Sequence, residues 1–123
     1  MKPSPDEFET LVAEGLKLVP DEFRPYLDNV QVVVEEEPSA ELLKKMGVTP
    51  NRTLFGLYIG TPLPERSVMY SGFPDRIIIF QRPFLEKFYH PDEIRREVAR
   101  TVLHEVAHHF GIDDDRLAEL GWG

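Results

Sequence analysis

Apolar residues recur at helical spacing in two long segments, one near each end of the chain. The first segment begins at Ser4-Pro5, an N-cap followed by a first-turn proline, and Pro20 ends it. The second begins at His90-Pro91-Asp92 and ends at Gly111, a typical residue just beyond a helix. The apolar positions are Phe8, Leu11, Val12, Leu16 and Val19 in the first, and Ile94, Val98, Ala99, Val102, Leu103, Val106, Ala107 and Phe110 in the second. We therefore predict two amphipathic helices.

Three shorter stretches between these helices predict strands: 30–36, which is rich in β-branched residues, 53–60, and the strongly apolar run 76–81. Pro38-Ser39 opens a short helix that runs to Met46 and ends at Gly47. Short helical turns are predicted at 21–27 and 83–89. The stretch 61–75 holds three prolines and one glycine, so we expect mostly loop, with a brief strand at 67–70. This order predicts an α+β fold in which a small sheet packs on helices.

The composition sets limits on size and partners. A chain of 123 residues with 41% hydrophobic residues is sufficient for one domain, 1–123, with a single core. The formal net charge is −8, from 22 acidic and 14 basic residues. No basic stripe runs along the chain, and such a stripe is what nucleic-acid binding requires. We therefore expect no nucleic acid as a partner, and the sequence leaves the oligomeric state open.

Cysteine is absent, so any metal must be held by His, Asp or Glu. The N-terminal residues are acidic where a leader peptide needs an apolar core, and no apolar run approaches the length of a membrane span. We therefore expect a cytoplasmic protein that does not bind membranes.

The chemistry is concentrated near the end of the second long helix, in His104-Glu105-x-x-His108. Residues four apart on a helix differ by about 40° around its axis, so both imidazoles can reach one ion. Glu105 is rotated by about 100° from His104, which places it beside the metal as a general base. Neutral imidazoles and carboxylates suit Zn²⁺. The alternative is a polar helix end whose histidines favour the C-terminal dipole.

A third ligand is needed, and Gly111 would let the chain turn back sharply after the helix. Asp114 follows three residues later, which completes the short-spaced zincin pattern H-E-x-x-H-x-x-G-x-x-D. Asp113 and Asp115 are not excluded by spacing, and Glu119 is a weaker candidate. His109 lies about 140° around the helix from His104, so we expect it in the core or supporting the ligands.

The stretch "HEVAHHFGIDDDRLAELGW", preceded by "GLYIGTPLPERS" and "IIIFQRPF", resembles the small single-domain bacterial zincin-like metallopeptidases, or minimal zincins. The resemblance covers roughly residues 5–122. It implies a small mixed sheet over the active-site helix and one Zn²⁺ held by His104, His108 and Asp114, with Glu105 as general base. It also implies that extended substrate pairs with an edge strand, located within 53–60 or near Ser67–Tyr70.

Several features of larger zincins are missing. Only nine residues follow Asp114, no methionine turn is present, and no tyrosine follows the motif to stabilise the oxyanion. A tyrosine or arginine for that role would come from elsewhere, with Tyr58, Tyr70, Arg66 and Arg82 as candidates. We expect a zinc-dependent hydrolase, most simply a metallopeptidase acting on a peptide or protein. The alternatives are a zincin-fold module that binds a protein partner without cleaving it, and a hydrolase of a non-peptide amide or ester.

Overall fold

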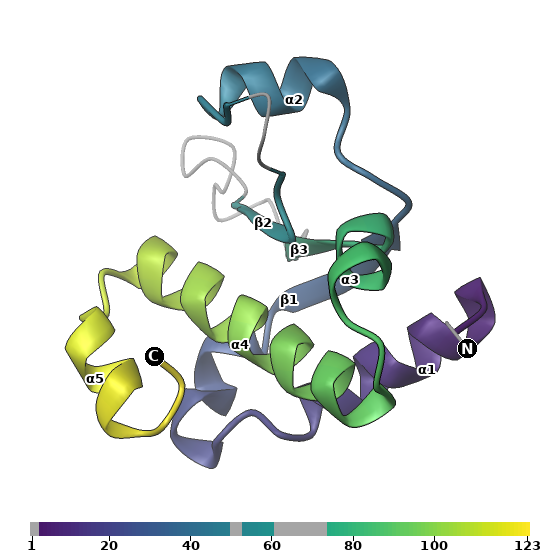
Figure 1. The fold of residues 1–123 in the computed structure, drawn as a ribbon. Helices are drawn as coiled ribbons and strands as arrows, with labels where there is room; N and C mark the ends of the chain where they lie inside the picture. The colour runs from purple at the N-terminus through teal and green to yellow at the C-terminus, as the bar shows by residue number, and fades with distance from the viewer. Residues whose placement is uncertain (1–2, 50–52, 61–73) are drawn as a thin grey trace.

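A computed structural model describes residues 3–49, 53–60 and 74–123 of the chain (Figure 1). The helices are α1 (Pro5–Leu16), the 3-10 helix η1 (Asp21–Leu27), α2 (Ala40–Lys45), α3 (Gln81–Lys87), α4 (Pro91–Phe110) and α5 (Asp114–Glu119). The strands are β1 (Val30–Glu35), β2 (Gly56–Ile59) and β3 (Asp75–Phe80). The predicted α+β class is confirmed.

Most predicted elements form, with small shifts at their ends. The first long helix ends at Leu16, before the predicted stop at Pro20, yet Val19 is still buried in the turn that follows. The strand predicted at 53–60 pairs only over Gly56–Ile59. Gln81 begins α3 directly after β3 and so does not belong to the strand. The strand predicted at 67–70 lies outside the described residues.

The described strands form one mixed sheet in the order β1-β3-β2. β1 runs parallel to β3, with Val32 opposite Ile77. β2 runs antiparallel to β3, with Tyr58 also opposite Ile77. The central strand β3 carries the most apolar run, and Ile77 to Phe80 are all buried. β2 is therefore an edge strand, and its far side is turned to α4 rather than to another described strand.

Helix α4 is the longest of the described helices, and residues on two of its faces are buried. One face packs against the sheet and α1 through residues four apart, Ile94, Val98, Val102 and Val106. The other face packs against η1, α5 and the closing segment through Ala99, Leu103 and Ala107. The apolar residues that recur every four positions along α4 thus form two adjacent stripes, and each stripe packs into a different part of the core. His104, Glu105 and His108 occupy the side of the helix that remains.

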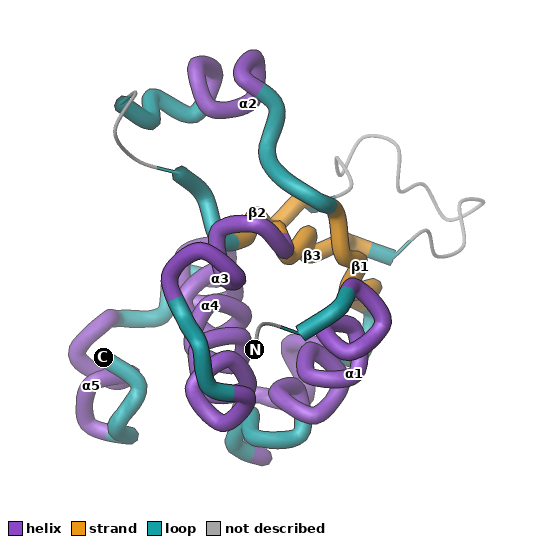
Figure 2. The backbone as a smooth tube through the Cα atoms, turned by 45° about the vertical axis from the view of Figure 1, so that its right-hand side comes forward, coloured by secondary structure: helices purple, strands orange, loops and turns teal. Residues whose placement is uncertain are grey.

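Helix α2 stands apart from this body in both views, and it contributes no buried residue (Figure 2). Its ends are fixed by its own sequence: the Ser39 side chain accepts a hydrogen bond from Leu42 N, and Gly47 follows with a positive φ of 72°. Nothing in the described part of the chain forms a helix both long and apolar enough to cross a membrane.

Candidate active site

Strand β2 and the residue after it lie along the second half of α4, and each second residue of this segment contacts the next turn of the helix. A Cβ atom at Gly56 would lie 2.7 Å from Thr101 Cγ2, and one at Gly60 would lie 3.0 Å from His109 Cε1. Between them, Tyr58 contacts Glu105. Two residues of a strand span about 6.8 Å, and four residues of a helix span about 6.0 Å. Because these lengths are similar, every second residue of the strand can contact every fourth residue of the helix. The absence of a side chain at Gly56 is what permits this close approach.

Glu105 is anchored by this arrangement. Its Oε1 accepts a hydrogen bond of 2.9 Å from the main-chain N–H of Tyr58. Burial raises the pKa of the Glu105 carboxyl above its ordinary value, and the Tyr58 N–H and the neighbouring His108 and His104 act against that rise. A carboxylate that is half-buried, fixed in direction and easier to protonate than usual has the properties of a general base.

A groove of about 270 Å³ opens beside this carboxylate, between the start of β2 and the helix. Both His104 and Glu105 line it, together with Thr53, Leu54, Phe55, Gly56, Arg100 and Thr101. The groove therefore brings two members of the predicted motif to the edge strand of the sheet.

His104 makes its own contact on the opposite side. Its Nε2 lies 2.8 Å from the main-chain oxygen of Trp122, in the closing segment of the chain. Trp122 is buried, with 8% of its surface exposed. This contact links the His104 ring on α4 to a main-chain group eighteen residues later in the chain.

His108 lies close to one of the aspartates after the helix. Gly111 adopts the left-handed conformation, φ 71° and ψ 26°, and ends α4 as predicted. The chain turns back, and His108 Nε2 lies 4.0 Å from Asp114 Oδ1. The Asp113 side chain is used differently, because it caps α5 by accepting a hydrogen bond of 2.9 Å from Asp115 N. Glu119 forms an ion pair with Arg116 at 3.2 Å.

The predicted ligands are therefore brought together in part. His108 and Asp114 form a pair, whereas His104 faces Trp122, and among residues 3–49, 53–60 and 74–123 no three His, Asp or Glu side chains are grouped closely enough to hold a metal. The donor chemistry nonetheless fits Zn²⁺: two imidazoles one helical turn apart, and a carboxylate within reach of the second. The assignment of His104, His108 and Asp114 as ligands stays a prediction.

His109 does not point into the groove with His104 and Glu105. Its ring stacks on Tyr58, with ring centroids 4.0 Å apart and planes tilted by 18°, and it meets the edge of Phe110. His109 is exposed, so of its two expected roles, a place in the core or support of the ligands, the core role was wrong. The Tyr58 hydroxyl in turn donates a hydrogen bond of 2.6 Å to Asp75, which is 8% exposed.

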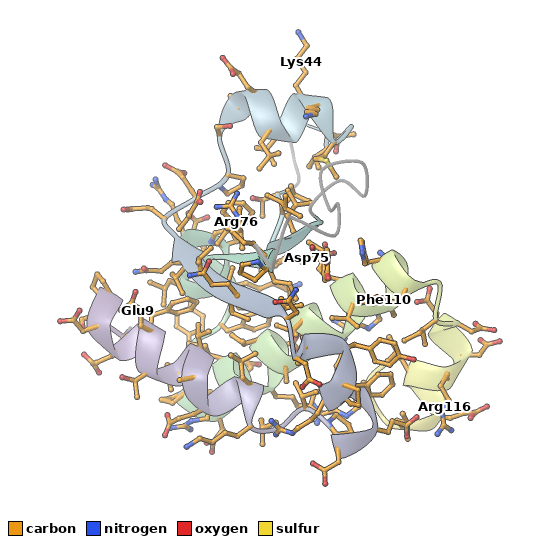
Figure 3. All side chains as sticks on the ribbon, turned by 180° about the vertical axis from the view of Figure 1, so that it is seen from behind. Glu9, Lys44, Asp75, Arg76, Phe110 and Arg116 are labelled. Carbon is orange, nitrogen blue, oxygen red and sulfur yellow. The ribbon has the colours of Figure 1, made fainter. Side chains whose placement is uncertain are left out.

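A larger cleft of about 500 Å³ lies at this other end of β2. Asp75 and Phe110, both labelled in Figure 3, line it from the sheet and from the end of α4. His109 lines it too, but none of the three predicted metal ligands does. The larger of the two hollows therefore lies away from the HExxH motif. We choose the smaller groove as the candidate site because His104 and Glu105 line it.

Two candidates for oxyanion stabilisation are engaged elsewhere. Tyr58 donates to Asp75, and Arg82 pairs with Glu37 and Glu86 at 3.2 and 3.0 Å. Arg66 and Tyr70 lie outside the described residues. Sequence reasoning missed the contributions of the Tyr58 N–H and the Trp122 oxygen, because main-chain groups leave no residue-type signal.

Comparison with known proteins agrees with the geometry. Residues 27–122, most of the chain, match the family described as zincin-like metallopeptidase. Among solved structures, the chain is similar to a conserved hypothetical protein from Thermus thermophilus, with 26% identity and a TM-score of 0.55 over 88% of this chain and 94% of that one. No curated protein matches it significantly. The family match, over a fold with a mixed sheet beside an HExxH helix, establishes that the chain belongs to the zincin-like metallopeptidase family.

Proposed function

We propose that this protein is a zinc-dependent peptidase, in which His104, His108 and Asp114 hold one Zn²⁺ and Glu105 is the general base. The observation that carries the proposal is the position of Glu105. Its carboxylate is fixed by Tyr58 N at the edge strand, and it lines the same groove as His104. Membership of a zincin-like family supports zinc-dependent hydrolysis at the level of the family.

When bound, zinc would lower the pKa of a water molecule towards about 7 and polarise the substrate carbonyl. Glu105 accepts the proton that the attacking water loses, and it then delivers that proton to the leaving amine. Both transfers use the same carboxyl group, first as a base and then as an acid, and burial raises the pKa of this carboxyl above its ordinary value. The Tyr58 N–H engages Oε1, which fixes the direction of the carboxyl group while protons move.

We place the peptide substrate in the groove of about 270 Å³ along the start of β2. Alternate residues of a strand direct their main-chain N–H and C=O groups to the same side. The main-chain groups of Gly56 therefore point to the same side as the Tyr58 N–H, which donates to Glu105. An extended peptide laid along Gly56 would bring its backbone beside the general base. This choice favours the 53–60 segment as the substrate-binding edge.

The test is turnover of a peptide library by zinc-loaded protein and by Glu105→Gln. We expect cleavage by the parent and a loss of about 100-fold or more in the variant, because it removes general-base catalysis. Glu93→Gln is the matched control, an exposed glutamate in the first turn of the same helix. If Glu105→Gln cleaves like the parent, Glu105 is not the base. If the parent cleaves nothing, the alternative of a module that binds a protein partner is favoured.

A further inference from the structure

The cleft of about 500 Å³ lies along the same strand as the smaller groove. Gly56, at the start of β2, lines the groove, whereas Tyr58 and Gly60, further along, line the cleft. Tyr58 connects the two hollows, because its main-chain N–H anchors Glu105 and the residue itself borders the cleft. Four residues of extended chain span about 13 Å. An extended peptide laid along β2 therefore reaches from the groove into the cleft.

The cleft has aromatic walls. Tyr26 from η1 and Phe110 from α4 are both exposed, and their ring centroids lie 5.0 Å apart. Phe110 also meets the ring of Tyr58 edge to face, at 6.1 Å and 84°, and the His109 ring stacks on the same tyrosine. The four rings thus form a continuous series. Exposed rings grouped in a hollow are typical of a binding surface, and the face of such a ring attracts a cation.

The cleft also carries negative charge. Asp75 is 8% exposed, and it accepts a hydrogen bond of 2.6 Å from the Tyr58 hydroxyl. A Cβ atom at Gly60 would lie 3.0 Å from His109 Cε1 and 3.9 Å from Asp75 Oδ1, so a side chain there would fill the space beside both residues. Asp28 adds an exposed carboxylate. Neither Lys nor Arg occurs among the described residues that line the cleft.

This combination suits a flexible apolar stem that ends in a positive charge. The stem packs on the aromatic rings, and the charged group lies against a ring face and pairs with a carboxylate. In a peptide, lysine and arginine have such side chains. An acidic side chain would be repelled by Asp28 and Asp75, and an uncharged apolar one would gain nothing from them. The formal net charge of −8 also favours the approach of basic peptides.

We propose that the cleft of about 500 Å³ binds a lysine or arginine side chain of the substrate, with Asp28 and Asp75 as the residues that determine this specificity. The inference deepens the proposed peptidase function and rests on it. It gives the larger hollow a role next to the HExxH groove, and it places the stacked pair of Tyr58 and His109 in the wall of a subsite.

The first measurement needs no catalysis. Metal-free protein is titrated with two blocked alanine pentapeptides, one with lysine and the other with norleucine at its centre, and the ring signals of Tyr26, His109 and Phe110 are followed by NMR. Norleucine keeps the apolar stem but lacks the ammonium group. We expect the lysine peptide to act at a concentration lower by about 10-fold or more, the usual effect of a hydrogen bond to a charged group.

Two variants control this titration. Asp28→Lys should abolish the difference between the peptides, since it reverses an exposed charge at the cleft. Asp21→Asn should keep the difference, because Asp21 is an exposed acid of the same η1 region that does not line the cleft. An equal response to both peptides, or no response of the three rings to the lysine peptide, would overturn the inference.

The second measurement is kcat/KM of zinc-loaded protein for library peptides that carry lysine, arginine, norleucine or glutamate at one position. We expect a preference for lysine over norleucine of about 10-fold or more, which falls to about one in Asp28→Lys and in Asp75→Asn. Because Asp75 is buried, thermal unfolding must show that Asp75→Asn is folded. Asp28 is exposed, so its replacement leaves the core intact.

The outcomes separate the two proposals. If the zinc-loaded protein cleaves peptides without preferring basic side chains, the inference is wrong and the peptidase stands. If it cleaves nothing while the lysine peptide still shifts the three ring signals, the peptidase proposal fails and the cleft remains a binding site for basic peptides. If neither cleavage nor binding is found, both proposals fail.

Discussion

The main-chain N–H of Tyr58 donates a hydrogen bond of 2.9 Å to Oε1 of Glu105, and this bond joins the edge strand of the sheet to the proposed general base. Because the donor belongs to the backbone, no side-chain substitution at Tyr58 removes it directly. The geometry of this bond depends instead on how closely β2 approaches α4. Gly56, two residues before Tyr58, permits that approach because it has no side chain.

Gly56→Ala should move the strand away from the helix. The added Cβ would lie 2.7 Å from Thr101 Cγ2 and 3.1 Å from Ile78 O, so we expect a loss of about 1–3 kcal/mol in the free energy of unfolding, together with reduced peptide cleavage. Thr101→Ser removes the methyl group that would clash. Denaturant unfolding of Gly56→Ala/Thr101→Ser should show partial recovery, and strictly additive losses would contradict this account of the contact.

Gly111→Ala tests the turn that brings Asp114 back to His108. Both Gly111 and Gly47 have positive φ, 71° and 72°, and open space around a would-be Cβ. Alanine at either position should cost about 1–2 kcal/mol of stability. Only Gly111→Ala should also weaken zinc binding, because Gly47 ends α2, far from the motif in the fold (Figure 1). Equal zinc affinities in the two variants would show that the turn does not position a ligand.

His109→Ala should leave zinc binding unchanged. The His109 ring stacks on Tyr58 and does not share the groove of His104 and Glu105, so we expect only a loss of about 0.5–1.5 kcal/mol in stability from the missing ring contact. His109→Phe, which keeps a ring at this place, should recover most of it. A calorimetric zinc titration in which His109→Ala lowers the affinity as much as His108→Ala does would contradict the distinction between these neighbours.

Much of the fold could be predicted because its signals are local. Ser4 with Pro5, and Gly111 after Phe110, mark helix ends through their own backbone chemistry. The run at 76–81 is apolar because β3 is the central strand. The strand at 53–60 was predicted too long, because only the part that faces β3 and α4 forms paired structure.

The candidate site was predictable only as far as its side chains reveal it. Helical spacing indicated which histidines share a side of α4, and it correctly set His109 apart. Tyr58 N and Trp122 O could not be found this way, since both are main-chain groups brought to the motif by long-range packing. The stacking of His109 on Tyr58 has the same origin, as the two residues lie far apart in the chain.

The most direct test of the account is zinc binding by metal-free protein, measured by calorimetry and by elemental analysis. We predict one Zn²⁺ per chain. Zinc affinity should fall in His104→Ala, His108→Ala and Asp114→Ala, and by more than the factor of about 10–100 that follows the loss of a group supporting a ligand. His90→Ala, at the start of the same helix, and Asp115→Ala, beside Asp114, serve as matched controls that should bind like the parent. Absence of zinc, or equal affinity in the three ligand variants and the two controls, would contradict the proposed metal site.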